Sequence, residues 1–500
     1  MAETLLGTFR PSAADPWDRA KAAHLLGRAG FGGTPDDIAR LAGMRFEDAV
    51  EELLEYERIS DEPFPEVDFS EVRELAQALV DLRRGGAAER EVREASQQLR
   101  RANVQKFQEI RAGWVQRMLQ TRRPLQEKMV LFWHGHLVSG FPDVTSAEHM
   151  AMQLALFRQM ATGSFKELIL AISQDPAMLS YLDNNSNRKG KPNENYAREL
   201  MELFTLGVGN FGEQDVKEAA RAFTGWTFAA NEFVFRRNQH DDGMKTFLGR
   251  TGTFDGTDVI EIIFAQPAAD RHLPRKLFEF FAYQGPEEPV IDELAAIFRR
   301  SDWSVRAVLR ALFRSALFYS PRTVRAQVKS PVELVVGAVR ALGVEVPPQA
   351  LLRALDLMGQ SLLYPPNVGG WPKGKGWINT ATILVRYNFS KLLLDGTMPG
   401  AGGRRSMTGG APGRVGTRAR PIPLEQLIDA GRVWTAGDVI TQLLDRFIQA
   451  PLEPRRRWAL LRAFGTNRED APVTIDSAQF PDQLLAAVHL IMSMPEYQLT

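Results

Sequence analysis

The sequence predicts an all-α protein, a body of many helices with one short β-hairpin near residues 226–248. In most segments, apolar residues recur at the three- and four-residue spacing of a helix. Many of these segments begin at Ser, Thr, Asn or Asp and end at Gly. Strand signals are rare by comparison. The aromatic stretches Trp226–Phe228 and Phe233–Phe235 flank Asn231, which predicts a hairpin.

The most regular helix is predicted between Asn193, a good N-cap, and Gly207, which ends the helix. At about 100° per residue, one half of this helix is apolar and the other half is polar. The apolar half comprises Tyr196, Ala197, Leu200, Met201, Leu203 and Phe204, and the polar half comprises Glu194, Asn195, Arg198, Glu199 and Glu202. The apolar half must pack against other elements. The polar half is either a solvated surface or the wall of a polar cleft.

Length and composition describe an ordinary globular chain. Its 500 residues exceed one typical domain, and 44% are hydrophobic and 24% charged, which allows a large core. Because the net charge is zero, we expect no nucleic-acid partner. The absence of cysteine excludes disulfides, thiolate metal sites and a thiol nucleophile. No apolar run reaches transmembrane length and no secretory signal is evident, so the expected location is the cytoplasm.

Changes in composition along the chain suggest three regions. Residues 1–395 form the main helical body, with a sub-boundary near residue 122 and a long helical stretch that Gly85 and Gly86 divide. Residues 396–423 are rich in Gly and Arg and contain no acid, so a flexible loop or linker is predicted. Residues 424–500 return to a helical pattern, and we expect this segment to pack on the body.

Histidines are the first candidate metal ligands. His134 and His136 flank Gly135 near the end of a predicted helix, and His240 precedes Asp241 in a predicted loop. Residues two apart on a helix point about 200° apart, so His134 and His136 can share an ion only if the helix frays or ends there. A bound divalent metal is one interpretation of these patterns. Packed histidines and a simple turn at residues 240–241 are the alternatives.

Amides and tryptophans are candidate ligand contacts. The amide-rich stretch 183–190 leads into Asn193 and Asn195, which suits a polar ligand or simple turn chemistry. Trp371 and Trp377 lie on a loop rich in Gly and Pro. Together with Trp226 they could form an aromatic platform for a glycan or a peptide. Alternatively, the tryptophans of this loop plug the core.

Several long motifs occur along the chain in a fixed order. They include HLLGRAGFGGTP from His24, EKMVLFWHGHLVSG from Glu127, PNENYARELMELFTLGVG from Pro192 and MGQSLLYPPNVGGWPKGKGW from Met358. In this order they resemble a large bacterial family, domain of unknown function 1800 (DUF1800), over nearly the whole chain. Relatives usually carry Asn between the two histidines, where this chain has Gly135, and His at the position of Phe204. The resemblance implies no specific activity.

An enzyme with a polar or metal-binding cleft is the first function hypothesis, with hydrolytic or oxidative chemistry. Such an enzyme would use these residues: His134, His136 and Glu194 as ligands with His240 and Asp241 nearby, Arg198 to orient an anionic substrate, and Glu199 or Glu202 as general base. A purely structural role is a further alternative, in which Arg and Glu pairs such as Glu194–Arg198 only crosslink helices.

A non-catalytic binding or assembly protein, with a glycan or protein partner, is the second hypothesis. The family resemblance implies one such partner, a protein of the DUF1501 family, which looks like a relative of sulfatases or phosphatases. It also implies a cell-envelope or periplasmic setting as the alternative to the cytoplasm. Convergence of the histidines on one pocket would favour the enzyme, and their separation would favour a binding or structural protein.

Overall fold

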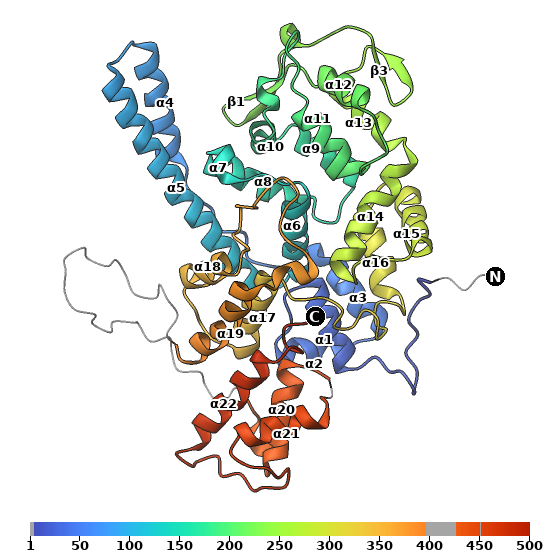
Figure 1. The fold of residues 1–500 in the computed structure, drawn as a ribbon, viewed down its shortest axis with the longest axis vertical. Helices are drawn as coiled ribbons and strands as arrows, with labels where there is room; N and C mark the ends of the chain where they lie inside the picture. Colours follow the sequence, from blue (N-terminus) through green and yellow to red (C-terminus); the bar gives the residue numbers. More distant parts are fainter. Residues whose placement is uncertain (1–4, 397–426, 451) are drawn as a thin grey trace.

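The computed structural model describes residues 5–396, 427–450 and 452–500 (Figure 1). Within these ranges the protein has 22 α-helices and two small antiparallel sheets of two strands each. The predicted all-α class with a short hairpin is therefore confirmed. The predicted Gly- and Arg-rich linker, apart from Gly396, lies outside the described residues. The division into regions at residues 122, 395 and 424 stays a prediction.

Three short helices begin the chain and pack near the centre of the molecule in Figure 1. They are α1 (Arg19–Ala29), α2 (Pro35–Ala42) and α3 (Phe46–Leu54). The start of α2 shows how local sequence fixes such an element. The Thr34 hydroxyl accepts from the Asp37 N–H at 3.1 Å, and the Asp37 carboxylate accepts from the Thr34 N–H at 3.0 Å. This capping box satisfies two N–H groups that the helix itself leaves unpaired.

A long helical hairpin, α4 (Ser70–Arg84) and α5 (Glu89–Gln120), projects from the body at the upper left of Figure 1. The two helices are divided at Gly85 and Gly86, as predicted, and Gly86 has a φ of +69°. The 32 residues of α5 span about 48 Å at 1.5 Å per residue. The inner part of α5 packs on α8, α17 and α18, whose bounds follow.

The middle of the chain folds into eight helices, with the strands at the top of Figure 1. The helices are α6 (Pro124–His136), α7 (Phe141–Val144), α8 (Ala147–Gln159), α9 (Phe165–Ser173), α10 (Pro176–Tyr181), α11 (Asn195–Glu199), α12 (Glu213–Ala222) and α13 (Gly256–Phe264). Helix α6 is buried on nearly all sides, including the charged residues Glu127 and Lys128. A helix that is buried all round must find partners for its polar groups inside the core.

Two hairpins lie between α12 and α13. Strands β1 (Trp226–Ala229) and β2 (Glu232–Phe235) pair Trp226 with Phe235 and Phe228 with Phe233, as the predicted hairpin requires. A second hairpin, β3 (Lys245–Phe247) and β4 (Arg250–Gly252), was not expected. Its strands have only three residues each, too few to show an alternating pattern in the sequence.

The rest of the described chain is helical. It comprises α14 (Pro267–Phe281), α15 (Glu288–Arg300), α16 (Val305–Arg314), α17 (Pro331–Leu342), α18 (Pro348–Leu357), α19 (Thr380–Leu394), α20 (Ala436–Phe447), α21 (Pro454–Ala463) and α22 (Phe480–Ser493). Helix α22 packs on α19 and on α20 and α21, which lie at the bottom of Figure 1. Among the helices described, none is long and apolar enough to cross a membrane.

Candidate functional site

The helix predicted from Asn193 to Gly207 begins at Asn195 as α11 and continues into a π-helical segment, Leu200–Thr205. In this segment the Leu206 N–H donates to the Met201 carbonyl, five residues earlier, at 2.9 Å. Glu194, and not Asn193, is the N-cap residue of α11. The Asn193 side chain, one residue before the N-cap, still accepts a hydrogen bond from the Asn195 N–H at 3.0 Å. Gly207 ends the helix with a φ of +82°, as predicted.

The apolar half of this helix is buried, and the polar half lies on the surface. Arg198 binds the Glu194 carboxylate at 3.2 Å and both oxygens of Glu213 at 2.8 and 2.9 Å. Partial burial, and then the neighbouring Glu202, raise the pKa of the Glu199 carboxyl. None of these acids lines the two cavities described below. Their catalytic roles therefore stay a prediction, and the contacts are those of a surface ion-pair network.

His134 and His136 point to different surroundings because α6 continues without a break through Gly135. The His134 ring is fully buried edge-on to Trp114 and Trp371, with ring centres 5.8 and 5.2 Å away. Neither of its nitrogens has a hydrogen-bond partner among the described residues, and burial lowers its pKa to about 3. His134 is thus a neutral core residue.

His136 lies beside His272, a residue for which the sequence predicted no role. The His136 Nε2 donates to the Phe204 carbonyl at 3.0 Å, and the His272 Nε2 donates to the Leu203 carbonyl at 2.8 Å. Carbonyls in the last turn of a helix lack partners within the helix, so both rings cap the π-helical segment. Their centres are 6.0 Å apart. Because a carbonyl only accepts, each Nε2 carries the proton and each Nδ1 is left as an acceptor.

Both imidazoles of this pair are held neutral. Burial lowers the pKa of His136 well below its ordinary value, and electrostatic repulsion from His272, Lys373 and Lys276 lowers it further. Burial likewise lowers the pKa of His272 to about 4. The same two lysines act on both rings, so the four side chains share one neighbourhood.

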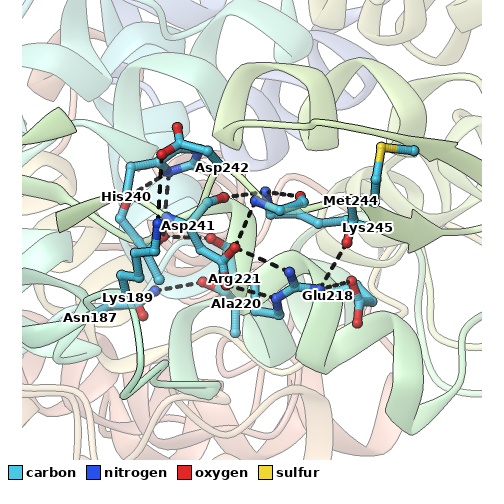
Figure 2. A network of polar contacts seen from close by, with 12 residues as sticks. Asn187, Lys189, Glu218, Ala220, Arg221, His240, Asp241, Asp242, Met244 and Lys245 are labelled. Atoms are coloured by element: carbon cyan, nitrogen blue, oxygen red, sulfur yellow. Dashed lines mark hydrogen bonds and ion pairs between the residues drawn. The ribbon is translucent and has the colours of Figure 1, made fainter. Parts of the chain in front are cut away.

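His240 and Asp241 belong to a different network, which fixes the loop between the two hairpins (Figure 2). Arg221 on α12 donates to both Asp241 oxygens, at 2.9 and 3.1 Å, and lowers the pKa of this carboxyl to about 2. The His240 Nδ1 donates to the Thr224 carbonyl at 2.9 Å. The buried Lys245 ammonium donates to the carbonyls of Asp241 and Gly243. All these groups satisfy one another, as in a structural crosslink.

A metal centre finds no support in this geometry. In the part of the chain that the structure describes, no group of three or more His, Asp or Glu residues is arranged to hold an ion. The expected ligands are separated: His134 lies between tryptophans, His136 on the π-helical segment, Glu194 on the surface and His240 beside Thr224. Residues two apart on an unbroken helix cannot converge, and Gly135 does not end α6.

The three tryptophans are buried, so they do not form an exposed platform. Trp226, Trp371 and Trp377 are 3%, 8% and 6% exposed. Trp371 packs over Gly135, where a Cβ would lie 3.6 Å from the indole. The Trp371 Nε1–H has no acceptor within the described ranges. This packing fits the alternative in which the loop plugs the core, and ligand contact by these rings stays a prediction.

A small pocket lies beside His136, with a volume of about 80 Å³, and we call it the His136 pocket. Its walls come from α6, α14, residues 327–330 and the loop 371–377. The apolar lining includes Leu131, Phe132, Phe280, Trp371 and Trp377, and the polar lining includes His136, Lys276, Glu279 and Lys373. The volume admits several water molecules or one small ion.

The charges around the His136 pocket are unevenly paired. Glu333 on the wall is bound by the Lys128 ammonium and by the Ser330 N–H of its own helix, and its pKa is lowered. Lys276 and Lys373, in contrast, have no carboxylate within 4 Å among the residues described. Burial, and then Lys276, lower the pKa of Lys373, while Glu279 acts in the opposite direction. Lys276 and Lys373 thus lack ion-pair partners, although Glu279 on the same wall acts on Lys373 from a greater distance.

Fold and pocket together define a many-helix protein with a small pocket whose wall carries two lysines without ion-pair partners. Residues 24–499 match the family model described as protein of unknown function (DUF1800), and the chain belongs to this family. The predicted resemblance is confirmed. No curated protein and no solved structure matches the chain.

Proposed function

We propose that this DUF1800 protein binds a small oxyanion, free or as the anionic group of a small molecule, in the His136 pocket. The observation that carries the proposal is the presence of two ammonium groups, Lys276 and Lys373, without ion-pair partners on one small pocket. Lys276 is partly buried and Lys373 is exposed, and an anion that binds between the two gains a charge-assisted contact with each.

The uncharged groups of the pocket include one unpaired donor and one acceptor. The Trp371 Nε1–H is a buried donor without an acceptor. The Nδ1 of His136 is an acceptor, because its Nε2 is committed to Phe204. Phosphate, sulfate and their monoesters share the chemistry that these groups recognise, which is several acceptor oxygens around one centre. The aromatic wall would contact the organic part of an ester.

Binding is favoured over proton transfer in this pocket. Burial holds the pKa values of His136 and His272 far below neutrality, which makes both rings weak bases. Catalysis of a hydrolytic or oxidative reaction, with or without a divalent metal, is a more specific proposal that rests on the sequence alone. A DUF1501 protein as partner and a cytoplasmic or cell-envelope location are further proposals, and they rest on the sequence and the resemblance alone.

The test is calorimetric titration of the full chain with phosphate and with sulfate at constant ionic strength. We expect saturable binding, weakened about tenfold or more in Lys276→Met and in Lys373→Met, since each loses a charge-assisted contact. Lys375→Met is the matched control, because Lys375 lies on the same loop, is exposed and does not line the pocket. No saturable binding by the wild type, or equal binding by all three variants, would overturn the proposal.

A further inference from the structure

A second and larger cavity lies on the other side of the segment that carries Gln327 to Ser330. Its volume is about 670 Å³, and it is enclosed by α1, residues 316–329, α17, residues 446–450 and residues 496–500. We call it the Lys329 cavity. Volumes of about 300–1,000 Å³ are typical of small-molecule sites. Nothing in the proposed function uses this cavity.

The walls of the Lys329 cavity are largely apolar and aromatic. Its side chains include Phe9, Phe31, Ile38, Tyr319, Phe447 and Tyr497, all of them buried in the core of the protein. Phe9 packs edge-on to Phe46, which lies behind the wall, with ring centres 5.1 Å apart, and Phe447 packs edge-on to Tyr497 at 6.3 Å, so the walls are held in place. A rigid apolar wall favours a ligand with a hydrocarbon or aromatic body.

The acids on the wall of this cavity already have partners. The contacts are Asp15 with Lys21 at 2.7 Å, Glu496 with Arg456 at 2.6 Å, Glu333 with Lys128, and Asp18 with the N–H of Lys21 at 2.9 Å. An acid that is paired exerts little attraction on a further cation. These carboxylates therefore do not define a cation site.

The cation Lys329 has no such partner. Within the described part of the chain, no carboxylate lies at ion-pair distance from its ammonium group, which instead stacks 4.2 Å from the centre of the Tyr497 ring. Its backbone is fixed, because its N–H donates to the Gln498 carbonyl at 2.8 Å. Burial lowers the pKa of Lys329 to about 8, and Arg325 and Arg386 add to this while Glu333 opposes it.

Arg325, on the same wall, adds positive charge. Its guanidinium donates to the Ile448 carbonyl at 2.8 Å, and it too has no carboxylate at ion-pair distance among the described residues. Its backbone has a φ of +57°, in the left-handed region that residues with a side chain rarely adopt. The cavity thus combines an apolar body with a cationic end formed by Lys329 and Arg325.

We infer that the Lys329 cavity binds a small amphipathic monoanion, with its carboxylate at Lys329 and its apolar body against the aromatic wall. One charge is favoured over two because the acids of the wall are already paired, and Lys329 and Arg325 together form one cationic end that a single carboxylate can contact. A carboxylate also replaces the missing acceptor for the ammonium N–H groups, while an alcohol supplies no charge.

The test compares three probes of equal chain length, octanoate, octanol and octylammonium, by calorimetric titration of the full chain. We expect octanoate to bind about tenfold or more tightly than octanol, and octylammonium not to bind measurably. This comparison needs only the wild type, so it does not depend on whether a variant folds. Equal affinity for octanoate and octanol, or absence of octanoate binding, would overturn the inference.

Variants then locate the site. Lys329→Met keeps the length of the side chain and should reduce the octanoate affinity to that of octanol, while Lys329→Arg should retain the preference. Lys276→Met, which alters the His136 pocket, should leave octanoate binding unchanged and weaken only phosphate or sulfate binding. Octanoate binding that survives in Lys329→Met but not in Lys276→Met would refute the inference and leave the proposed function standing.

Discussion

The buried carboxylate of Glu127 on α6 offers a direct test of how this core is held together. Arg158 donates to its two oxygens at 2.6 and 3.0 Å, the Trp114 indole donates at 3.1 Å, and Arg117 approaches to 3.5 Å. Glu127 itself is 0% exposed. Glu127→Gln keeps the size of the side chain but removes its charge, so Arg158 loses its counter-ion, while Arg117 keeps the Asp61 carboxylate at 2.9 Å.

The expected loss of unfolding free energy in Glu127→Gln follows from the burial of the Glu127 carboxylate. Removing one partner of a buried ion pair costs about 3–5 kcal/mol, because the remaining charge stays buried without compensation. The amide oxygen of Gln still accepts from one donor, so we expect the lower end, about 3 kcal/mol. The control is Glu194→Gln. Its side chain is 37% exposed and Arg198 keeps Glu213, so its expected cost is about 0–1 kcal/mol.

The assay is urea unfolding at equilibrium, followed by both tryptophan fluorescence and far-ultraviolet circular dichroism. Trp114 contacts Glu127 directly and reports on the region around it. Two probes are needed because a chain of this length can unfold in more than one step. A shift for Glu127→Gln no larger than that for Glu194→Gln would refute the idea that this buried network stabilises the fold.

Two further predictions concern the capped helix end and the isolated histidine. Gly207→Ala should lower the thermal midpoint of unfolding more than Gly209→Ala. Both glycines have positive φ, but a Cβ at position 207 would lie 2.9 Å from the His272 Nδ1, whereas a Cβ at position 209 meets no atom within 4 Å. Equal shifts in the thermal midpoint would contradict this prediction. The pKa of His134 is about 3 in the folded state and about 6.5 when unfolded, so its contribution is present above pH 6.5 and lost as the pH falls toward 3. His134→Phe should therefore lose less thermal stability than the wild type between pH 7 and pH 4.5, and an unchanged loss would contradict this assignment.

The elements with strong local signals could be predicted from the sequence. The hairpin at Trp226–Phe235 and the end of the helix at Gly207 depend on residues within a few positions of one another, and the structure confirms both. The apolar half of the helix beginning at Asn195 is buried because spacing along a helix fixes which side chains share a face. The spacing of apolar residues did not reveal the π-helical segment. A π-helical turn changes which backbone N–H and C=O groups are hydrogen-bonded, but it leaves the spacing of apolar side chains nearly the same.

The candidate site could be predicted only in part, because its contacts join distant parts of the chain. His136 was a candidate, but its partner His272 reaches the Leu203 carbonyl across 69 positions, and no local pattern marks such a contact. Lys276 and Lys373 matter for a different reason, namely that neither has a carboxylate at ion-pair distance among the described residues. A sequence shows that a lysine is present, and only the structure shows what surrounds it.

The short segment from Gln327 to Ser330 has a thermodynamic consequence if both cavities take ligands. It is extended and bridges to Leu499, with Lys329 facing the larger cavity and Val328 and Ser330 facing the smaller one. A ligand that binds in one cavity and shifts this segment changes the affinity of the other cavity for its own ligand. Linkage requires the effect to be reciprocal, so octanoate must change the affinity for sulfate by the same factor by which sulfate changes the affinity for octanoate.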